Sequence, residues 1–232
     1  MRSEEQRVCL GLPYLQGLAH SSISQLLEGA RLQRFHAHAV LIEQGRSPEF
    51  LHLVVEGRVE VFSRYRDRET TVDVLGEGES FILAAVFLDR AYLKSARALT
   101  PVRLLLLPAL SVREVFQGDP AFAERCAADL ARGYRRLVKE VSNLKLRSSL
   151  ERLANWLLHH ARRDEANPQF DIPFDKKTLA AKLGIAPEVL SRNFAALAAH
   201  GVRVSGKSVE VTDFARLEDL AQPVPAIDDP AY

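Results

Sequence analysis

Three polar residues near the C-terminus, Glu188, Ser191 and Arg192, have side chains that can form hydrogen bonds with the edges of DNA bases. Arginine can donate two hydrogen bonds to guanine, glutamate can accept one from cytosine, and serine can bond to a base or a phosphate. A helix would place all three on one face, because they stand at i, i+3 and i+4. Glu188 and Arg192 also have the spacing of an ordinary surface ion pair, so the surrounding elements must decide between the two interpretations.

The stretch around these residues has the spacing of a helix-turn-helix. Asp175 can cap a first helix over 176–183, and Gly184 can end it with a left-handed turn. Pro187 opens a second helix only two residues later, although Ala186 occupies the cap position and forgoes about 1 kcal/mol of capping energy. The apolar stripe of this second helix consists of Leu190, Phe194 and Leu197.

Basic residues flank this pair of helices. Lys176 and Lys177 begin the first helix, where they can hold phosphates, and residues 202–211 predict a two-stranded hairpin with Lys207 at its tip. The pattern is typical of a winged helix-turn-helix that presents the N-terminal turns of its second helix to DNA. This context favours base reading by Glu188, Ser191 and Arg192 over an ion pair.

A long helix is predicted before this domain. Asp119 and Pro120 form a helix-start signal, and no proline follows over residues 121–146. The alternate spacings of 4 and 3 give a heptad stripe, which indicates a dimer-forming helix, although packing against its own domain is the alternative. The stripe consists of Leu130, Tyr134, Leu137, Val141 and Leu144. Residues 132–147 carry six Lys/Arg and one acid, which also suits a solvated helix face.

The remaining chain completes an α+β architecture. Residues 35–110 are short β-branched or alternating runs separated by turn signals, which predicts an antiparallel barrel or roll of about eight strands. We therefore expect a β-roll domain over 1–118, a dimerisation helix over 119–147 and the DNA-binding domain over 148–222. The last segment, 223–232, has three prolines and no apolar periodicity, and we expect it to be a flexible tail.

Composition excludes several functional classes. The chain has 232 residues, a formal net charge of +1 and two cysteines, Cys9 and Cys126, without CxxC spacing. Neither a secretory leader nor a membrane-spanning stretch is evident, so we expect a cytoplasmic protein with no membrane role. Because no nucleophile motif, P-loop or HExxH is present, we do not expect an enzyme.

The chain resembles the CRP/FNR superfamily of bacterial transcription regulators over nearly its whole length. EGRVEVF (56–62) resembles the β-roll hairpin, ERLANWLL (151–158) the first helix of the DNA-binding domain, and LGIAPEVLSR (183–192) the recognition helix. The resemblance implies a homodimer on double-stranded DNA with TTGA…TCAA half-sites. It implies that Arg192 reads guanine, Glu188 the opposite cytosine and Ser191 a thymine.

The same resemblance guides the expected sensor chemistry. Cyclic-AMP binders of the family carry a Gly-Glu pair and an Arg-Ser pair in the β-roll. In this chain Leu83 falls near the position of that glutamate, and Tyr92-Leu93 falls near the position of the Arg-Ser pair. Lys94-Ser95 lies two positions after Tyr92-Leu93. Cyclic AMP is therefore disfavoured, since an apolar wall would bind a cyclic phosphate poorly. An FNR-type iron–sulfur cluster is not expected either, because it needs four cysteine ligands.

An apolar effector pocket remains as the expectation. Its wall would come from Phe81, Leu83, Val86, Phe87 and Tyr92. Such a pocket suits haem or another flat apolar ligand, and the form of residues 185–192 is most similar to the DNR branch, which responds to nitric oxide and uses haem. Candidate haem ligands are His20, His36, His38 and His52, with no motif to select one, and a metal ligand set stays undefined.

The sequence is compatible with two accounts of regulation. In the first, an effector in the β-roll changes how the two dimer helices pack and so changes DNA binding. In the second, the β-roll is a ligand-independent platform and the abundance of the protein sets its activity. RNA polymerase is an expected partner if the protein activates transcription.

Overall fold

The computed structural model describes residues 3–161, 169–229 and 232 of the chain. It divides into two compact units, residues 1–133 and 134–232. The division falls within the long helix α5 (Pro120–Leu146). Within the described residues, no helix combines the length and the apolar character needed to cross a membrane.

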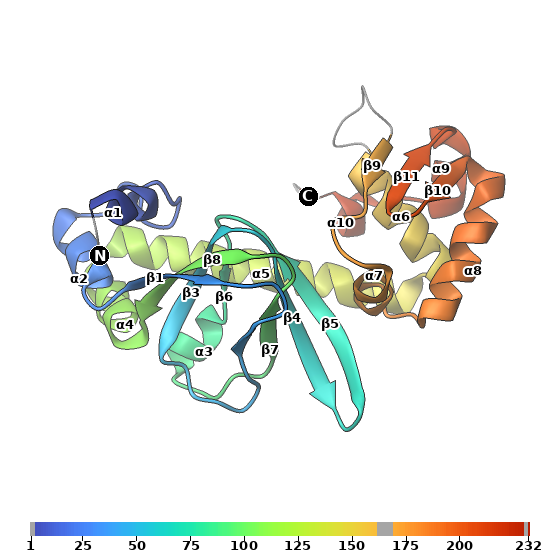
Figure 1. Cartoon of the computed structure of the whole chain (residues 1–232). Coiled ribbons are helices and arrows are strands. Elements are labelled where there is room, and N and C mark those ends of the chain that lie inside the picture. Colours follow the sequence, from blue (N-terminus) through green and yellow to red (C-terminus); the bar gives the residue numbers. More distant parts are fainter. Residues whose placement is uncertain (1–2, 162–168, 230–231) are drawn as a thin grey trace. The chain divides into compact units, whose positions relative to one another are not determined.

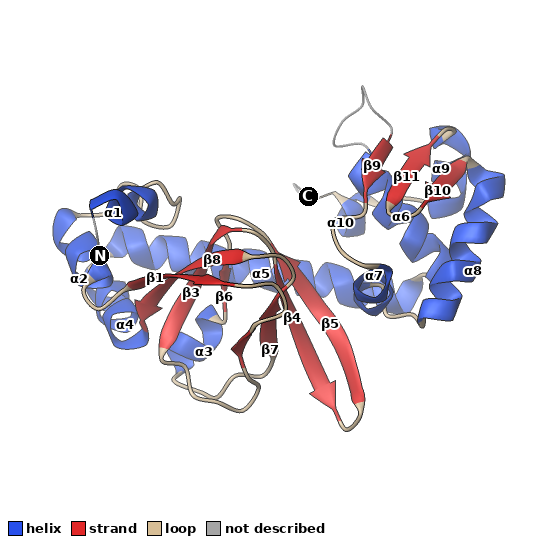
Figure 2. Ribbon diagram, in the orientation of Figure 1, coloured by secondary structure: helices blue, strands red, loops and turns tan. Residues whose placement is uncertain are grey.

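The first unit contains two four-stranded antiparallel sheets, which confirms the predicted β-roll (Figure 2). One sheet has the strand order β1-β8-β3-β6 and the other β2-β7-β4-β5. The strands are β1 (Arg31–Phe35), β2 (Val40–Ile42), β3 (Phe50–Glu56), β4 (Val59–Tyr65), β5 (Arg68–Leu75), β6 (Ser80–Phe81), β7 (Ser95–Ala98) and β8 (Val102–Pro108).

Strand β8 explains how the core is divided. Its sequence VRLLLLP buries side chains on both faces of the sheet, because successive residues of a strand point to opposite sides. Leu105 and Leu107 join a cluster with the flanking helices, whereas Leu104 and Leu106 join a second cluster with the other sheet. His52 pairs with Leu106 in the register of β3 and β8, so it lies on the face of the second cluster.

Helices α1 (Ser3–Leu10), α2 (His20–Leu27), α3 (Leu83–Leu88) and α4 (Ala109–Gly118) complete the first unit. The sequence predicted strands throughout 35–110, but α3 interrupts them between two left-handed residues, Ile82 and Asp89. The predicted strand around His36 and His38 is also different, since β1 ends at Phe35 and a turn with His38 at φ +68° follows.

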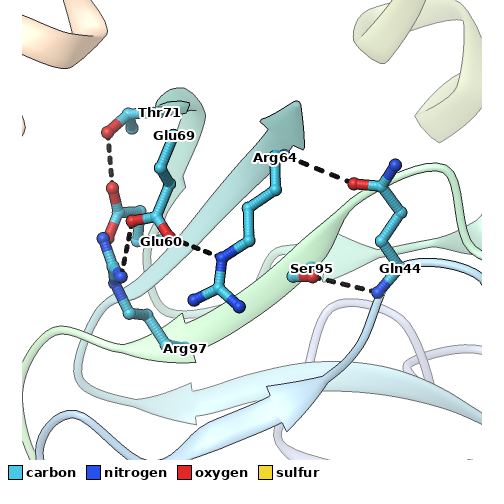
Figure 3. Close-up of polar contacts among 7 residues, drawn as sticks. All are labelled: Gln44, Glu60, Arg64, Glu69, Thr71, Ser95 and Arg97. Carbon is cyan, nitrogen blue, oxygen red and sulfur yellow. Dashed lines mark hydrogen bonds and ion pairs between the residues drawn. The ribbon is translucent and has the colours of Figure 1, made fainter. Parts of the chain in front are cut away.

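A polar network joins strands β4, β5 and β7 (Figure 3). Glu60 is 1% exposed, and its carboxylate accepts hydrogen bonds from Arg97 Nε at 2.6 Å and from Thr71 Oγ1. Arg97 also contacts Glu69 at 2.7 Å, and Arg64 donates to Glu69 at 2.9 Å. Although burial raises the pKa of Glu69, these two guanidinium groups bring it below its usual value. The network therefore fixes the register of three strands through paired charges.

Helix α5 begins as predicted. The Asp119 carboxylate accepts hydrogen bonds from the backbone N–H groups of Ala121 and Phe122, at 2.9 and 3.1 Å. These bonds satisfy donors that have no partner within the helix. The helix then continues for 27 residues.

The second unit contains the end of α5 and the C-terminal domain (Figure 1). Its helices are α6 (Ser149–Ala161), α7 (Lys176–Lys182), α8 (Pro187–Leu197), a 3₁₀ turn (Ala198–His200), α9 (Phe214–Ala221) and α10 (Pro225–Asp228). A three-stranded antiparallel sheet has the order β10-β11-β9, from β9 (Gln169–Asp171), β10 (Val202–Ser205) and β11 (Ser208–Val211).

The C-terminal segment, which the sequence predicts to be a flexible tail, contains a short helix. The described part of 223–232 includes α10, and the carboxylate of Asp228 forms an ion pair with Nη1 and Nη2 of Arg147. The two residues are 81 positions apart in the sequence, so local periodicity could not have indicated the contact.

Candidate nucleic-acid interface

Helix α8 separates its apolar and polar residues onto different faces. Leu190, Phe194 and Leu197 are buried, whereas Glu188, Ser191 and Arg192 are exposed. All three exposed residues lie in the first two turns, as a helix entering the major groove N-terminus first requires.

The exposed groups are open to a ligand. Among the ion pairs of the described residues, none joins Glu188 to Arg192, so the alternative of a surface ion pair is not realised. Ser191 Oγ donates to the carbonyl oxygen of Pro187 at 3.2 Å, one turn earlier in the helix. Its lone pairs can still accept a hydrogen bond from outside.

Helix α7 and the turn after it position α8. The Asp175 carboxylate accepts from the backbone N–H of Thr178 at 2.7 Å; burial raises the pKa of Asp175, but this bond and nearby charge lower it overall. Gly184 has φ +63°, the left-handed turn predicted from the sequence. A Cβ atom at Gly184 would lie 2.8 Å from Leu144 Cδ2 at the end of α5, so the turn also packs against that helix.

Exposed basic side chains lie on α7 and in the β10–β11 hairpin, and both α7 and β10 contact α8. The ammonium group of Lys176 lies 5.4 Å from the centroid of the Phe194 ring, a cation–π contact that holds it beside α8. Lys177 is exposed on the same turn, and Lys207 is exposed in the β10–β11 hairpin next to Gly206 at φ +61°. Cations on both sides of a reading helix are suited to phosphate contacts.

Arg152 is a positioning residue that the sequence did not single out. It is 8% exposed, and its Nε donates to the carbonyl oxygen of Leu183 at 2.9 Å, just before the Gly184 turn. Its Nη1 donates to the carbonyl oxygen of Arg147 at 2.7 Å. An arginine on the apolar face of the predicted helix was the available signal, since a buried guanidinium needs several acceptors.

The N-terminus of α8 lacks a side-chain cap, as expected. Ala186 has the extended backbone of a cap residue, with φ −73° and ψ 150°, but offers no acceptor atom. Ser148, in contrast, forms a capping box with Glu151 at the start of α6: each accepts a hydrogen bond from the backbone N–H of the other. The hydrogen bonds from the Ser148 hydroxyl and N–H lower the pKa of Glu151.

The heptad residues of α5 form an exposed apolar stripe. Their side chains are between 38% and 69% exposed, large values for apolar groups. The stripe residues are Leu130, Tyr134, Leu137, Val141 and Leu144.

The five expected effector-pocket residues are divided between the two core clusters. Leu83, Val86 and Phe87 pack with the helices, whereas Phe81 and Tyr92 pack between the sheets. A cavity of about 390 Å³, widely open to solvent, includes Tyr92 among its lining residues. It is lined by Val40, Leu41, Ile42, Glu43, Arg46, Ser47, Glu49, Phe50, His52 and Tyr92.

Burial separates His52 from the other histidines proposed as ligands. His20, His36 and His38 are exposed, whereas His52 is 6% exposed and contacts the Phe81 ring at 4.9 Å. Burial lowers the pKa of His52 to about 4, so its imidazole is neutral near pH 7. Its Nδ1 atom has no hydrogen-bond partner among the described residues.

The two cysteines are buried, unbridged thiols. Burial raises the pKa of Cys9 and of Cys126 to about 11. In the described part of the chain, no cluster of three or more His, Cys, Asp or Glu residues could hold a metal ion.

Two family models match the chain. The model described as a cyclic nucleotide-binding domain matches residues 32–119, and the Crp-like helix-turn-helix domain matches residues 151–220.

Relatives of known class cover most of the chain. The cAMP-activated global transcriptional regulator CRP of Pasteurella multocida is 25% identical over 197 residues, or 82% of this chain and 94% of that protein. A putative cAMP-binding regulatory protein from Silicibacter pomeroyi is 27% identical with a TM-score of 0.59, over 96% of this chain and all of the other. A putative CRP/FNR regulator from Eubacterium rectale shares the fold, with a TM-score of 0.73 at 19% identity over 91% and 98% of the two chains.

The fold, the Crp-like helix-turn-helix domain and the relatives thus define a DNA-binding transcription regulator. The chain belongs to the CRP/FNR family.

Proposed function

We propose that the protein regulates transcription as a homodimer that binds a palindrome with TTGA…TCAA half-sites. The observation that carries this proposal is the exposed row of Glu188, Ser191 and Arg192 on the first two turns of α8, opposite the buried stripe. Arg192 would donate to guanine, Glu188 would accept from the opposite cytosine, and Ser191 would contact a thymine. Lys176, Lys177 and Lys207 would hold phosphates beside them.

Gel shifts with the palindrome and a scrambled duplex test this assignment. Arg192→Ala should lose most of the preference for the palindrome, because a bidentate arginine–guanine contact contributes roughly 1–3 kcal/mol of discrimination per half-site. Lys177→Ala should weaken binding to both duplexes alike and reduce the salt dependence. Arg90→Ala removes one exposed positive charge from the other unit and serves as the control. If Arg192→Ala leaves the preference intact, the assignment is wrong.

Dimerisation belongs to the proposal. The exposed stripe of α5 would pair with that of a second copy, and the two α8 helices would have to lie about 34 Å apart to enter successive major grooves. The protein would act in the cytoplasm, with RNA polymerase as its partner at promoters where it activates.

The cavity beside β2 and β3 supports regulation by an effector. Its volume of about 390 Å³ lies near the lower end of ligand pockets, which span roughly 300–1,000 Å³. Its lining includes the apolar side chains of Ile42, Phe50 and Tyr92 together with the neutral imidazole of His52. We therefore favour a small uncharged ligand that exchanges a hydrogen bond with His52.

Haem fits this cavity poorly. Glu43 and Glu49 line it beside one guanidinium, Arg46, which is already 3.8 Å from Glu43, so the propionates of haem would meet net negative charge. The neutral imidazole of His52 is the one feature that favours haem and the nitric-oxide response of the DNR branch. A Soret band after haem reconstitution, absent from His52→Leu, would overturn the preference for a small ligand.

A contiguous set of contacts links the cavity to α5 inside the first unit. His52 packs on Phe81, and the neighbouring Ser80 donates through its hydroxyl to the Asp129 carboxylate on α5. Tyr14 donates to the same oxygen at 3.3 Å. A ligand that moved His52 would displace β6 and so change the hydrogen bonds of the dimer helix.

The alternative is control by abundance alone. Indole, a small uncharged aromatic with one N–H donor, is a suitable probe, since its transfer of NMR saturation from the protein would report binding. We expect binding to wild type, weakened in His52→Leu, with a change in DNA affinity on adding indole. Binding without any change in DNA affinity would favour the ligand-independent account.

A further inference from the structure

Three described residues after α9 contact the C-terminal half of α5 and the connection that follows it, all within the second unit. Arg147 donates to the carboxylate of Asp228, Lys139 to the carbonyl oxygen of Asp229, and Arg135 to that of Tyr232. One carboxylate and two backbone oxygens of this segment thus accept hydrogen bonds from basic side chains of α5 and of the connection that follows it.

The contact between Arg147 and Asp228 is the strongest of these. The Nη1 and Nη2 atoms of Arg147 donate to Oδ1 and Oδ2 of Asp228, at 2.7 and 2.6 Å. The two side chains are only 8% and 23% exposed, so water screens the pair weakly. Asp228 also accepts from the backbone N–H of Val224 at 2.7 Å, which fixes its carboxylate in place.

The tail leaves the dimer stripe free. Arg135 and Lys139 follow Tyr134 and Leu137 by one and two positions, which puts them at the outer b and f positions of the heptad when the stripe occupies a and d. A second copy could therefore pair along the stripe while the tail stays in place.

The tail reaches the joint between α5 and α6. Helix α5 ends at Leu146 and α6 begins at Ser149, so Arg147 lies in the connection. The backbone of Arg147 accepts from Arg152, which also holds the carbonyl oxygen before the Gly184 turn. Arg147 and Arg152 together thus link the tail, the joint and the helix-turn-helix.

We propose that the outer face of α5 is a docking surface for the chain's own C-terminal tail, and that the docked tail is an ionic strap holding the α5–α6 joint at one angle. The proposal rests on the dimeric DNA binding described above. In a dimer the joint angle sets the distance between the two α8 helices, so the strap preorganises the protein for one half-site spacing.

Hydrogen exchange of the full-length protein tests the strap without DNA. Asp228→Asn, or truncation after Gln222, should speed exchange of the amides at the end of α5 and the start of α6 roughly tenfold, the effect of losing a charge-assisted hydrogen bond. Asp219→Asn removes an equal charge from an exposed position of α9 and should leave these amides unchanged. Equal exchange in all four proteins would overturn the strap.

Binding to palindromes of altered spacing tests the consequence. Wild type should prefer one spacing, whereas Asp228→Asn and the truncated protein should bind duplexes with one or two base pairs added nearly as well as the original. An unchanged spacing preference would contradict the role of the joint angle. If no protein, wild type included, prefers any palindrome, the proposed half-sites fail, while the exchange result still decides the strap.

Discussion

The imidazole of His52 lies between the two sheets, where burial lowers its pKa from 6.5 to about 4. The folded protein therefore binds a proton at His52 less readily than the unfolded chain does, and protonation favours unfolding. The free energy of unfolding should fall as the pH is lowered from about 6.5 to about 4, by on the order of 3 kcal/mol from this residue.

Chemical denaturation between pH 4 and pH 7 measures this contribution. The His52→Gln variant has no titrating group at this position, so its stability should depend less steeply on pH over the same window. The carboxylates titrate alike in both proteins, so the difference between the two curves isolates His52. Parallel curves would mean that His52 is protonated as easily in the folded state as in the unfolded one.

Predictability at the residue scale depended on whether the deciding contacts are local. The exposed row of Glu188, Ser191 and Arg192 was predictable, because spacing along one helix places it. The burial of His52 was not, because Phe81 and Leu106, which cover it, come from distant strands. Arg152 was missed for the same reason: its acceptor on Leu183 is 31 positions away.

The uncapped start of α8 gives a prediction at the scale of the element. Ala186 already has the backbone of a cap residue, so a serine hydroxyl could accept from the free N–H groups of the first turn. Ala186→Ser should raise the free energy of unfolding by about 1 kcal/mol in denaturant titrations. Ala195→Ser, on the exposed middle of α8, should bring no such gain, because a serine there has no free N–H to cap.

Elements whose ends are marked by capping or turn residues were predictable, whereas elements that depend on tertiary contacts were not. Asp119, Asp175 and Gly184 mark helix ends through local chemistry, and each behaves as predicted. Helix α3 has an apolar sequence that suits a strand equally well, and the contacts of Leu83 and Val86 with the helical cluster accompany its helical form. Helix α10 is only four residues long and is held by Arg147 from another part of the chain.

The exposed stripe of α5 leads to a prediction about the oligomeric state of the protein. In a dimer joined along the α5 stripe, Leu137→Glu would place two carboxylates face to face in the interface. Leu137 is half exposed in the single chain, so the variant should still fold. Sedimentation should show a dimer dissociation constant raised roughly a hundredfold or more.

Leu146→Glu is the matched control for that experiment. It is the same substitution on the same helix, but Leu146 lies off the stripe and is 76% exposed. It should leave the dimer intact. A Leu137→Glu protein that sediments like wild type would exclude this stripe as the interface.

Leu144 lies in two structural contexts, so one substitution there would affect two properties of the protein. It belongs to the exposed stripe of α5, and its Cδ2 is also the atom nearest to where a side chain at Gly184 would begin. In a dimer joined along the stripe, a change at Leu144 that tightened association would also alter the packing against the Gly184 turn, which positions α8. Selection for one of these properties would constrain the other in such a dimer. A compensating change is then expected in the turn at residue 184 rather than on the paired helix.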